Sequence, residues 1–203
     1  LAFGTVPSAT AGSASVLGYP SSQSIDAAGP LPRGGTGQLV YNAAIGERES
    51  AVLVVKGAKS IGVSVTTPPE GLGIRLFFGH YVSAGGKSVA DALEPWGGGE
   101  RQVEGQNQPI YVQVEVPYGT PAGRYAGAIS VTADGQRATI PLRIRVFPVT
   151  LPRPDTRTGN LLTSFNVTPE SYVAKVAQLH GFASNDQRRA ANRALFALLG
   201  SYR

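Results

Sequence analysis

The chain of 203 residues contains no cysteine and no methionine, and only one tryptophan and two histidines. Without cysteine it has no disulfide, no thiolate metal ligand and no thiol nucleophile. The lack of methionine means that no initiator residue is present, so we expect a processed product or a piece of a longer protein. No basic segment followed by an apolar stretch begins the chain. Any export signal would therefore have been removed already, so the compartment stays open, and an exported or extracellular location is the one we favour.

Charge and long apolar runs are also scarce. Charged residues make up 15% of the chain, against roughly 25% in an average domain. No run approaches the roughly 20 apolar residues of a membrane-spanning helix, so no membrane span is predicted. The net charge is +5, and its densest cluster, Arg188, Arg189 and Arg193, lies on a predicted helix whose other face is aliphatic. This pattern favours a solvated helix face over a nucleic-acid site, which needs Lys and Arg interleaved with aromatic residues.

Short alternating segments fill the middle of the chain. Apolar residues make up 42% of it, and Gly (26) and Pro (15) are frequent, which is typical of many short strands joined by turns. Ile110, Val112 and Val114 alternate with polar residues, so this segment predicts a strand with one buried face. Seven or eight such strands, with no helix between them, predict an antiparallel, immunoglobulin-like β-sandwich over residues 37–150.

The pair Asp134-Gly135 is the strongest hairpin signal, because both residues of a type I′ turn need positive φ. The residue pairs that follow from this turn are Ala133 with Gln136, Val131 with Ala138, Ile129 with Ile140, Gly127 with Leu142, Tyr125 with Ile144 and, on the opposite face, Ala126 with Arg143. A slip of one residue would bury arginine side chains, so we predict this register.

Three further segments flank the predicted sandwich. Residues 1–36 are rich in Ala, Ser, Gly and Pro and predict an extended leader with one edge strand near residues 15–19. Closely spaced prolines in residues 151–160 predict a stiff linker. Residues 161–203 predict one strand followed by helix, a βα unit that we interpret as the truncated start of a (β/α)8 barrel. Its uncovered surfaces predict self-association through this segment.

No catalytic motif, metal site or cofactor site is predicted. The chain has no phosphate-binding loop, no dinucleotide-binding fingerprint and no nucleophile elbow, each of which needs a fixed spacing of residues. His80 and His180 lie in different predicted domains, and neither has the helical partner that a zinc site requires. We predict that His80 packs at the end of a strand.

Three residues around a glycine-rich loop are candidates for ligand binding. Trp96 precedes three glycines at residues 97–99 and could stack on a sugar ring, although a lone tryptophan in a sandwich is more often buried. Glu94 and Glu100 flank the same loop and could face a ligand or only solvent.

Four segments resemble a known family in their order and spacing. They are Gly46-Glu47-Arg48-Glu49-Ser50, Asp91-Ala92-Leu93-Glu94-Pro95, Gln108-Pro109-Ile110-Tyr111-Val112-Gln113-Val114-Glu115-Val116-Pro117 and Thr120-Pro121-Ala122-Gly123-Arg124-Tyr125-Ala126-Gly127. Over residues 45–203, the chain resembles the N-terminal β-sandwich, and the first barrel strand and helix, of glycoside hydrolase family 123. Two departures are Tyr111, where the family commonly has Trp, and Ala90, where it has Pro.

The resemblance implies a barrel that follows the sandwich and acts on N-acetylgalactosaminides with retention. In that family a neighbouring Asp-Glu pair serves a substrate-assisted mechanism, and the pair would lie beyond Arg203. No catalytic residue is therefore assigned, and we expect this chain alone to be inactive. The function we expect is an accessory sandwich that supports its own missing barrel and contacts glycan. The alternative is a free-standing immunoglobulin-like module that binds carbohydrate or protein.

Overall fold

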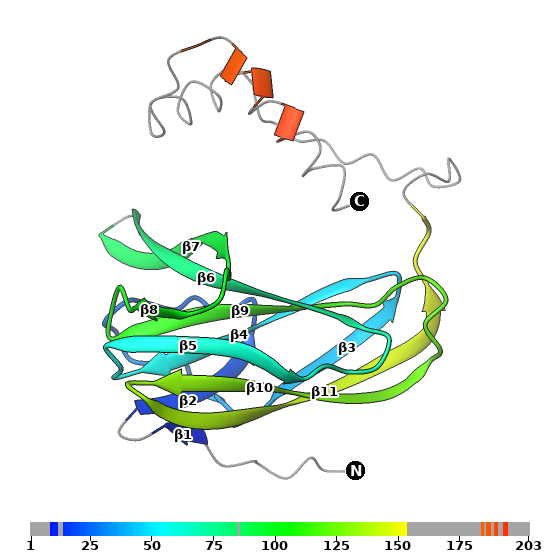
Figure 1. Cartoon of the computed structure of the whole chain (residues 1–203), viewed down its shortest axis with the longest axis horizontal. Helices are drawn as coiled ribbons and strands as arrows, with labels where there is room; N and C mark the ends of the chain where they lie inside the picture. The colour runs from blue at the N-terminus through cyan, green and yellow to red at the C-terminus, as the bar shows by residue number, and fades with distance from the viewer. Residues whose placement is uncertain are drawn as a thin grey trace. The chain divides into compact units, whose positions relative to one another are not determined.

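The computed structural model describes residues 9–11, 14–84 and 86–153, together with residues 184, 186–187, 189–190 and 193–194. The chain divides into two compact units, Leu1–Leu151 and Pro152–Arg203. The first unit is built from β-strands (Figure 1). In the second, the described positions after residue 184 are helical.

The strands that are described in the first unit form two sheets. Six lie in the order β1-β2-β4-β9-β6-β7 and five in the order β3-β11-β10-β5-β8. The strands of the six-stranded sheet are β1 (Ala9–Ala11), β2 (Ala14–Pro20), β4 (Arg48–Lys56), β9 (Asn107–Glu115), β6 (Gly73–Ala84) and β7 (Lys87–Pro95). Those of the five-stranded sheet are β3 (Leu39–Ile45), β11 (Gln136–Thr150), β10 (Gly123–Ala133), β5 (Ser60–Thr67) and β8 (Glu100–Gln102).

The strand order follows that of an immunoglobulin-like sandwich. With β2, β4, β9 and β6 as strands A, B, E and D, and β11, β10 and β5 as G, F and C, the sheets have the orders ABED and GFC. The mainly β sandwich is therefore confirmed. The number of strands was underestimated, because the described residues contain eleven. The sandwich is also not wholly antiparallel, since β3 pairs with β11 in parallel.

The predicted hairpin is confirmed residue by residue. β10 and β11 pair from Ala133↔Gln136 through Ile129↔Ile140 to Tyr125↔Ile144 and beyond. Asp134 has φ 47° and Gly135 has φ 81°, as a type I′ turn requires. The Asp134 carboxylate also accepts hydrogen bonds from the backbone N–H groups of Lys59 (3.0 Å) and Ser60 (2.8 Å). These bonds tie the turn to the start of β5.

A tyrosine closes the corner before β10. The Tyr125 hydroxyl donates a hydrogen bond of 2.6 Å to the Pro121 carbonyl oxygen, four residues upstream. Immunoglobulin-like domains use the same arrangement at the start of strand F. Tyr125 thus fixes the loop of residues 116–122, which crosses from one sheet to the other.

Inward-facing side chains of both sheets form one apolar core. The seven central residues that alternate along β9, β10 and β11 are each no more than 2% exposed: Ile110, Val112, Val114, Ile129, Ile140, Leu142 and Ile144. Their predicted burial is confirmed. Tyr41 of β3 is also buried, and its hydroxyl donates to the Val112 carbonyl oxygen at 3.1 Å, across the two sheets.

The segment predicted as a leader is part of the sandwich from Ala14 onward. β2 lies between β1 and β4, and its pairing with β4 runs from Ser15↔Lys56 to Pro20↔Ala51. Tyr19 and Ile25 form a second buried cluster with Val52 and Val54, on the face of β4 that points away from the main core. The start of the sandwich at residue 37 is therefore corrected, because the residues after β2 cover that face. Small residues hid this role, since they carry little periodic signal.

The second unit is described at few positions. Gln187 N donates to Ser184 Oγ at 3.2 Å, and Ser184 N donates to Gln187 Oε1 at 3.1 Å. This reciprocal pair is a capping box, which begins a helix, and the positions described after it are helical. The predicted strand near residue 161, most of the linker over residues 151–160 and the rest of the predicted βα unit lie outside the described residues.

Candidate functional site

A two-stranded ribbon extends the six-stranded sheet beyond the core. β6 pairs with β9 only as far as Phe78↔Ile110, whereas its pairing with β7 continues to Ala84↔Lys87. The register of the ribbon shifts between His80 and Tyr81, opposite Ala92 and Ala90. Figure 1 shows β6 and β7 continuing past the end of β9. Because an isolated two-stranded ribbon is only marginally stable, this one needs side-chain contacts that attach it to the rest of the sandwich.

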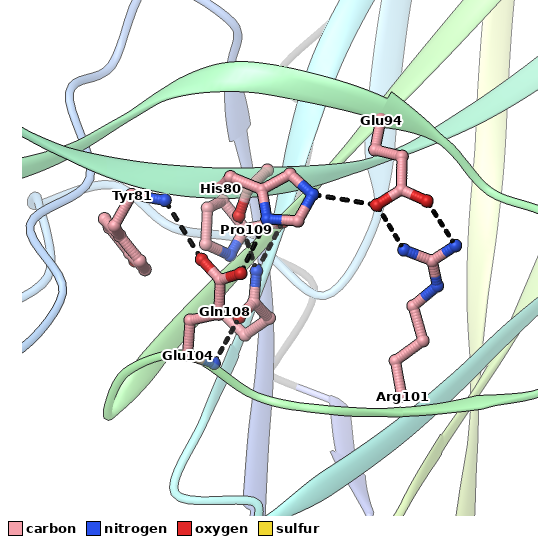
Figure 2. A network of polar contacts seen from close by, with 8 residues as sticks. His80, Tyr81, Glu94, Arg101, Glu104, Gln108 and Pro109 are labelled. Atoms are coloured by element: carbon pink, nitrogen blue, oxygen red, sulfur yellow. Dashed lines mark hydrogen bonds and ion pairs between the residues drawn. The ribbon is translucent and has the colours of Figure 1, made fainter. Parts of the chain in front are cut away.

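His80 lies on β6 between two carboxylates (Figure 2). Its Nδ1 is 2.6 Å from Glu104 Oε1, and its Nε2 is 2.9 Å from Glu94 Oε2. Glu94 on β7 is a diagonal neighbour of His80, because Ala92 lies directly opposite. Because an ionised carboxylate only accepts hydrogen bonds, these two contacts favour the imidazolium form, in which both ring nitrogens donate.

The charge of His80 follows from opposing effects on its pKa. Burial disfavours the charged ring, but the hydrogen bonds that it donates to Glu104 and Glu94 outweigh this effect and raise the pKa of His80 above its usual 6.5. Its side chain remains 35% exposed, so solvent screens part of this interaction.

Glu94 also pairs with Arg101 of β8, from the opposite sheet. The two guanidinium nitrogens Nη1 and Nη2 lie 2.8 and 2.9 Å from Oε2 and Oε1, a bidentate geometry. Hydrogen bonds from Arg101 and His80 lower the pKa of Glu94 to about 2. Both carboxylate oxygens of Glu94 therefore contact positively charged side chains of the protein.

Glu104 fastens the ribbon to the segment before β9. Its Oε2 accepts a hydrogen bond of 3.1 Å from Tyr81 N. The backbone N–H of Glu104 donates to the buried Gln108 Oε1 at 2.9 Å, and Gln108 Nε2 donates to the Gly79 carbonyl oxygen at 2.8 Å. Figure 2 shows His80, Tyr81, Glu104 and Gln108 as one network. We call His80, Glu94, Arg101 and Glu104 the ribbon latch.

A neighbouring buried asparagine ties the segment of residues 26–29 to the same place. Asn107 Nδ2 donates to the carbonyl oxygens of Asp26 and Gly29, each at 2.9 Å. The Tyr81 hydroxyl donates to the Asn107 carbonyl oxygen. The pair Asn107-Gln108 thus holds two loops and the ribbon together, and its polar atoms point into the protein.

The structure brings Glu94 and Trp96 together but separates Glu100 from them. Trp96 packs against the main core, with the Arg101 guanidinium 5.3 Å from its ring centre and Phe78 at 6.1 Å between centroids. Its Nε1 is buried without a hydrogen-bond partner among the described residues. Glu100 is exposed and precedes Arg101 on β8, so the pleat directs its side chain to the opposite face.

The latch is not arranged for nucleophilic or acid–base catalysis. A catalytic histidine needs one ring nitrogen that faces the reacting group, and here each nitrogen faces a carboxylate. A general acid near neutral pH needs a raised carboxyl pKa, whereas the pKa of Glu94 is lowered. Among the described residues, no group of three or more His, Cys, Asp or Glu could hold a metal ion. The arrangement fits a structural fastening.

The sequence indicated parts of this cluster but not its centre. Glu94 and Trp96 were found because they flank the glycine-rich loop. His80 does not pack at a strand end as predicted; it lies inside β6, and the four residues of β6 that follow it all pair with β7. Its partners are 14 and 24 residues away. The one contact that the sequence could have indicated is the diagonal pair of His80 and Glu94 in the β6–β7 hairpin. Predicting that pair would have required knowledge of the register shift.

Comparisons with known proteins give weak structural likenesses. No family model and no curated protein sequence matches the chain. A family 123 glycoside hydrolase from Clostridium perfringens is 16% identical with a TM-score of 0.40, over 57% of this chain and 24% of that enzyme. The N-terminal domain of PorA is 12% identical with a TM-score of 0.34, over 66% of this chain and 98% of that domain. The M1 domain from titin is 13% identical with a TM-score of 0.25, over 57% of this chain and 95% of that domain.

The match therefore spans about a quarter of the length of that hydrolase. In the part of the chain that the structure describes, no helix has the length and hydropathy needed to cross a bilayer.

Proposed function

We propose that the chain contributes the non-catalytic accessory sandwich of a protein similar to glycoside hydrolase family 123. In this proposal the sandwich supports a catalytic barrel, residues 151–160 link the two, and residues 161–203 begin the barrel. The sequence basis is the set of four segments that resemble the family in order and spacing. The structural support is that polar residues of these segments are bound within the sandwich, either to one another, as Arg48 is to Glu115, or to neighbouring residues.

The observation that carries the proposal is that these polar residues form hydrogen bonds and ion pairs within the sandwich. Glu47 Oε2 accepts a hydrogen bond of 2.6 Å from Ala44 N at the turn between β3 and β4. Arg48 and Glu115 form an ion pair of 3.2 Å across β4 and β9. Glu94 belongs to the ribbon latch, and Gln108 holds the loop that carries Glu104. Residues engaged in this way support a scaffold and are not available to a substrate.

Hydrolysis of a glycosidic bond needs groups that this arrangement does not offer. Such enzymes use an acid that protonates the leaving group, together with a second carboxylate or a substrate acetamide. Glu94 is held ionised by Arg101 and His80, and Glu47 is held by the backbone of its own turn. The catalytic groups of the proposed protein would therefore come from its barrel.

Glycan contact, expected at Trp96, Glu94 and Glu100, belongs to the same proposal in a narrower form: it is proposed at Glu100, because Glu94 is held by Arg101 and His80. Glu100 and the adjacent glycines at residues 97–99 are exposed, so a sugar could reach them without disturbing the core. The Trp96 ring is less accessible, because Phe78 and Arg101 pack against it.

The test uses the full protein as its gene encodes it. The coding sequence after Arg203 should continue for about 250 residues, the usual length of a barrel, and should encode an adjacent Asp-Glu pair. In that protein, His80→Gln should lower the thermal midpoint and leave kcat/KM for a chromogenic N-acetyl-β-galactosaminide within about twofold. Glu70→Gln, at an exposed position outside the latch and the proposed glycan contact, is the control and should change neither quantity. A stop codon after Arg203, or a loss of kcat with an unchanged midpoint in His80→Gln, would refute the proposal.

A free-standing binding module is the second candidate. The observation that favours it is a groove on the five-stranded sheet whose arginine side chains have no acidic partner in the part of the chain that the structure describes. This groove is developed below, and it does not depend on the presence of a barrel.

A further inference from the structure

A groove lies on the outer face of the five-stranded sheet, over β3, β11 and β10. Its volume is about 500 Å3, within the range of sites for small ligands or short polymer segments. The lining residues are Gln38, Val40, Tyr41, Asn42, Arg124, Tyr125, Ala126, Arg143, Ile144 and Arg145. The ribbon latch involves β6 and β7 of the six-stranded sheet and β8 at the far edge of this one, so the groove is a separate surface.

The groove carries positive charge without compensation. Arg124, Arg143 and Arg145 are all exposed. The three strands beneath them contain no Asp or Glu, and no ion pair joins these arginines to an acid among the described residues. Arg145 is held over the Phe147 ring, with 4.6 Å between its guanidinium carbon and the ring centre.

The register places like charges next to one another. Arg124 lies directly opposite Arg145, and Arg143 lies opposite Ala126 on the same face. Like charges that face each other across two strands destabilise a sheet. Among the described residues no ion pair with an acid offsets this cost, whereas an anion bound in the groove would.

We propose that this groove binds an acidic polysaccharide through its carboxylate or sulfate groups. The planar guanidinium fork matches the two oxygens of a carboxylate or sulfate and forms bidentate hydrogen bonds with them. The amide side chains of Gln38 and Asn42 line the same groove and can donate to and accept from sugar hydroxyls. Val40, which is 49% exposed, and Ala126 supply apolar surface for the sugar ring.

The shape and composition of the groove favour a sugar chain over other anions. A stable protein partner would cover about 800 Å² on each side and use aromatic anchors, whereas this groove is small. Of its two tyrosines, Tyr41 is buried and Tyr125 uses its hydroxyl to bond Pro121. A single-stranded nucleic acid would need exposed aromatic rings on which its bases could stack. A polyanion with hydroxyl groups remains the best match.

The test measures binding of defined oligosaccharides to the whole 203-residue chain by calorimetry at low salt. The probes are oligogalacturonate and chondroitin sulfate oligomers, with neutral dextran, poly-L-glutamate and a short DNA duplex as comparisons. The groove variant carries Arg124→Gln, Arg143→Gln and Arg145→Gln. The matched variant carries Arg33→Gln, Arg75→Gln and Arg137→Gln, which are exposed positions outside the groove. Both variants have the same net charge, so a difference between them reports the groove and not charge alone.

We expect at least one acidic oligosaccharide to bind, and the groove variant to lose about tenfold or more in affinity, since it removes three charge-assisted contacts to the anionic groups. The matched variant should stay within about twofold of the parent chain. The affinity of the single variant Arg143→Gln should lie between those of the two triple variants. This single variant provides the test if the triple groove variant does not fold. Equal losses in both triple variants, equal binding of dextran, or tighter binding of poly-L-glutamate or DNA would each overturn the assignment.

Discussion

Nδ1 of His80 lies 2.6 Å from Oε1 of Glu104, and the opposite ring nitrogen lies 2.9 Å from Glu94. A charged ring therefore joins the β6–β7 ribbon to the segment that leads into β9. Protonation of a single side chain contributes to the attachment of an extended hairpin, which makes this attachment sensitive to pH.

The thermal stability should fall as the pH rises past the pKa of His80. This pKa is raised above 6.5 in the folded chain, so the stabilisation is complete below 6.5 and is lost as the pH passes the higher folded value. Melting the protein at intervals between about pH 6 and about pH 9 should show a small fall, because solvent screens the side chain. His80→Gln should remove the fall, and His180→Gln, which changes the other histidine, should retain it. An unchanged profile in His80→Gln would contradict the prediction.

The Glu94 carboxyl should titrate far below its ordinary range. Hydrogen bonds from Arg101 and His80 lower its pKa to about 2 from 4.5, so its contribution is present above 4.5 and is lost as the pH falls towards 2. Carbon-detected NMR of the side-chain carboxyl gives the midpoint directly. In Arg101→Gln the midpoint should move up towards 4.5. A midpoint near 4.5 in the unmodified chain would show that the latch does not form.

Truncation of Ile140 should be costly. The residue is fully buried and lies opposite Ile129 on the inner face, so Ile140→Ala should reduce the free energy of unfolding by about 2–5 kcal/mol through lost transfer energy and the cavity left behind. The control is Val40→Ala on the outer face, which should cost less than about 0.5 kcal/mol. Urea denaturation measures both. Similar losses in the two variants would argue against the register of β10 and β11.

Removal of the Tyr125 hydroxyl should weaken the corner before β10. Tyr125→Phe deletes the hydrogen bond to the Pro121 carbonyl and should cost about 0.5–1.5 kcal/mol in the free energy of unfolding. Tyr111→Phe is a suitable control, because its hydroxyl has no hydrogen bond among the described residues. A loss in Tyr111→Phe as large as that in Tyr125→Phe would exclude the corner as the cause.

Features that depend on neighbouring residues could be predicted from the sequence. The Asp134-Gly135 turn and the alternation beside it determine the β10–β11 register, because both act over a few residues. The burial of Ile110, Val112 and Val114 followed from period-two alternation in the same way. Local chemistry suffices for elements of this kind.

Features that depend on pairing between distant segments could not be predicted from the sequence. Nothing near residue 39 indicates that β3 pairs in parallel with β11, and the small residues of β2 do not show that this strand pairs with β4. The ribbon latch joins residues from β6, β7, β8 and the loop before β9. Its geometry depends on a register shift and on the approach of the two sheets, neither of which has a sequence signature.

The most direct test of the central claim is a hydrolysis assay of the purified 203-residue chain with a chromogenic N-acetyl-β-galactosaminide. We predict no turnover above the uncatalysed rate, because Glu47, Glu94 and Glu115 of the family-like segments are bound to partners within the sandwich. Turnover that is abolished by His80→Gln or Glu94→Gln would show that the ribbon latch is an active site and would contradict this account.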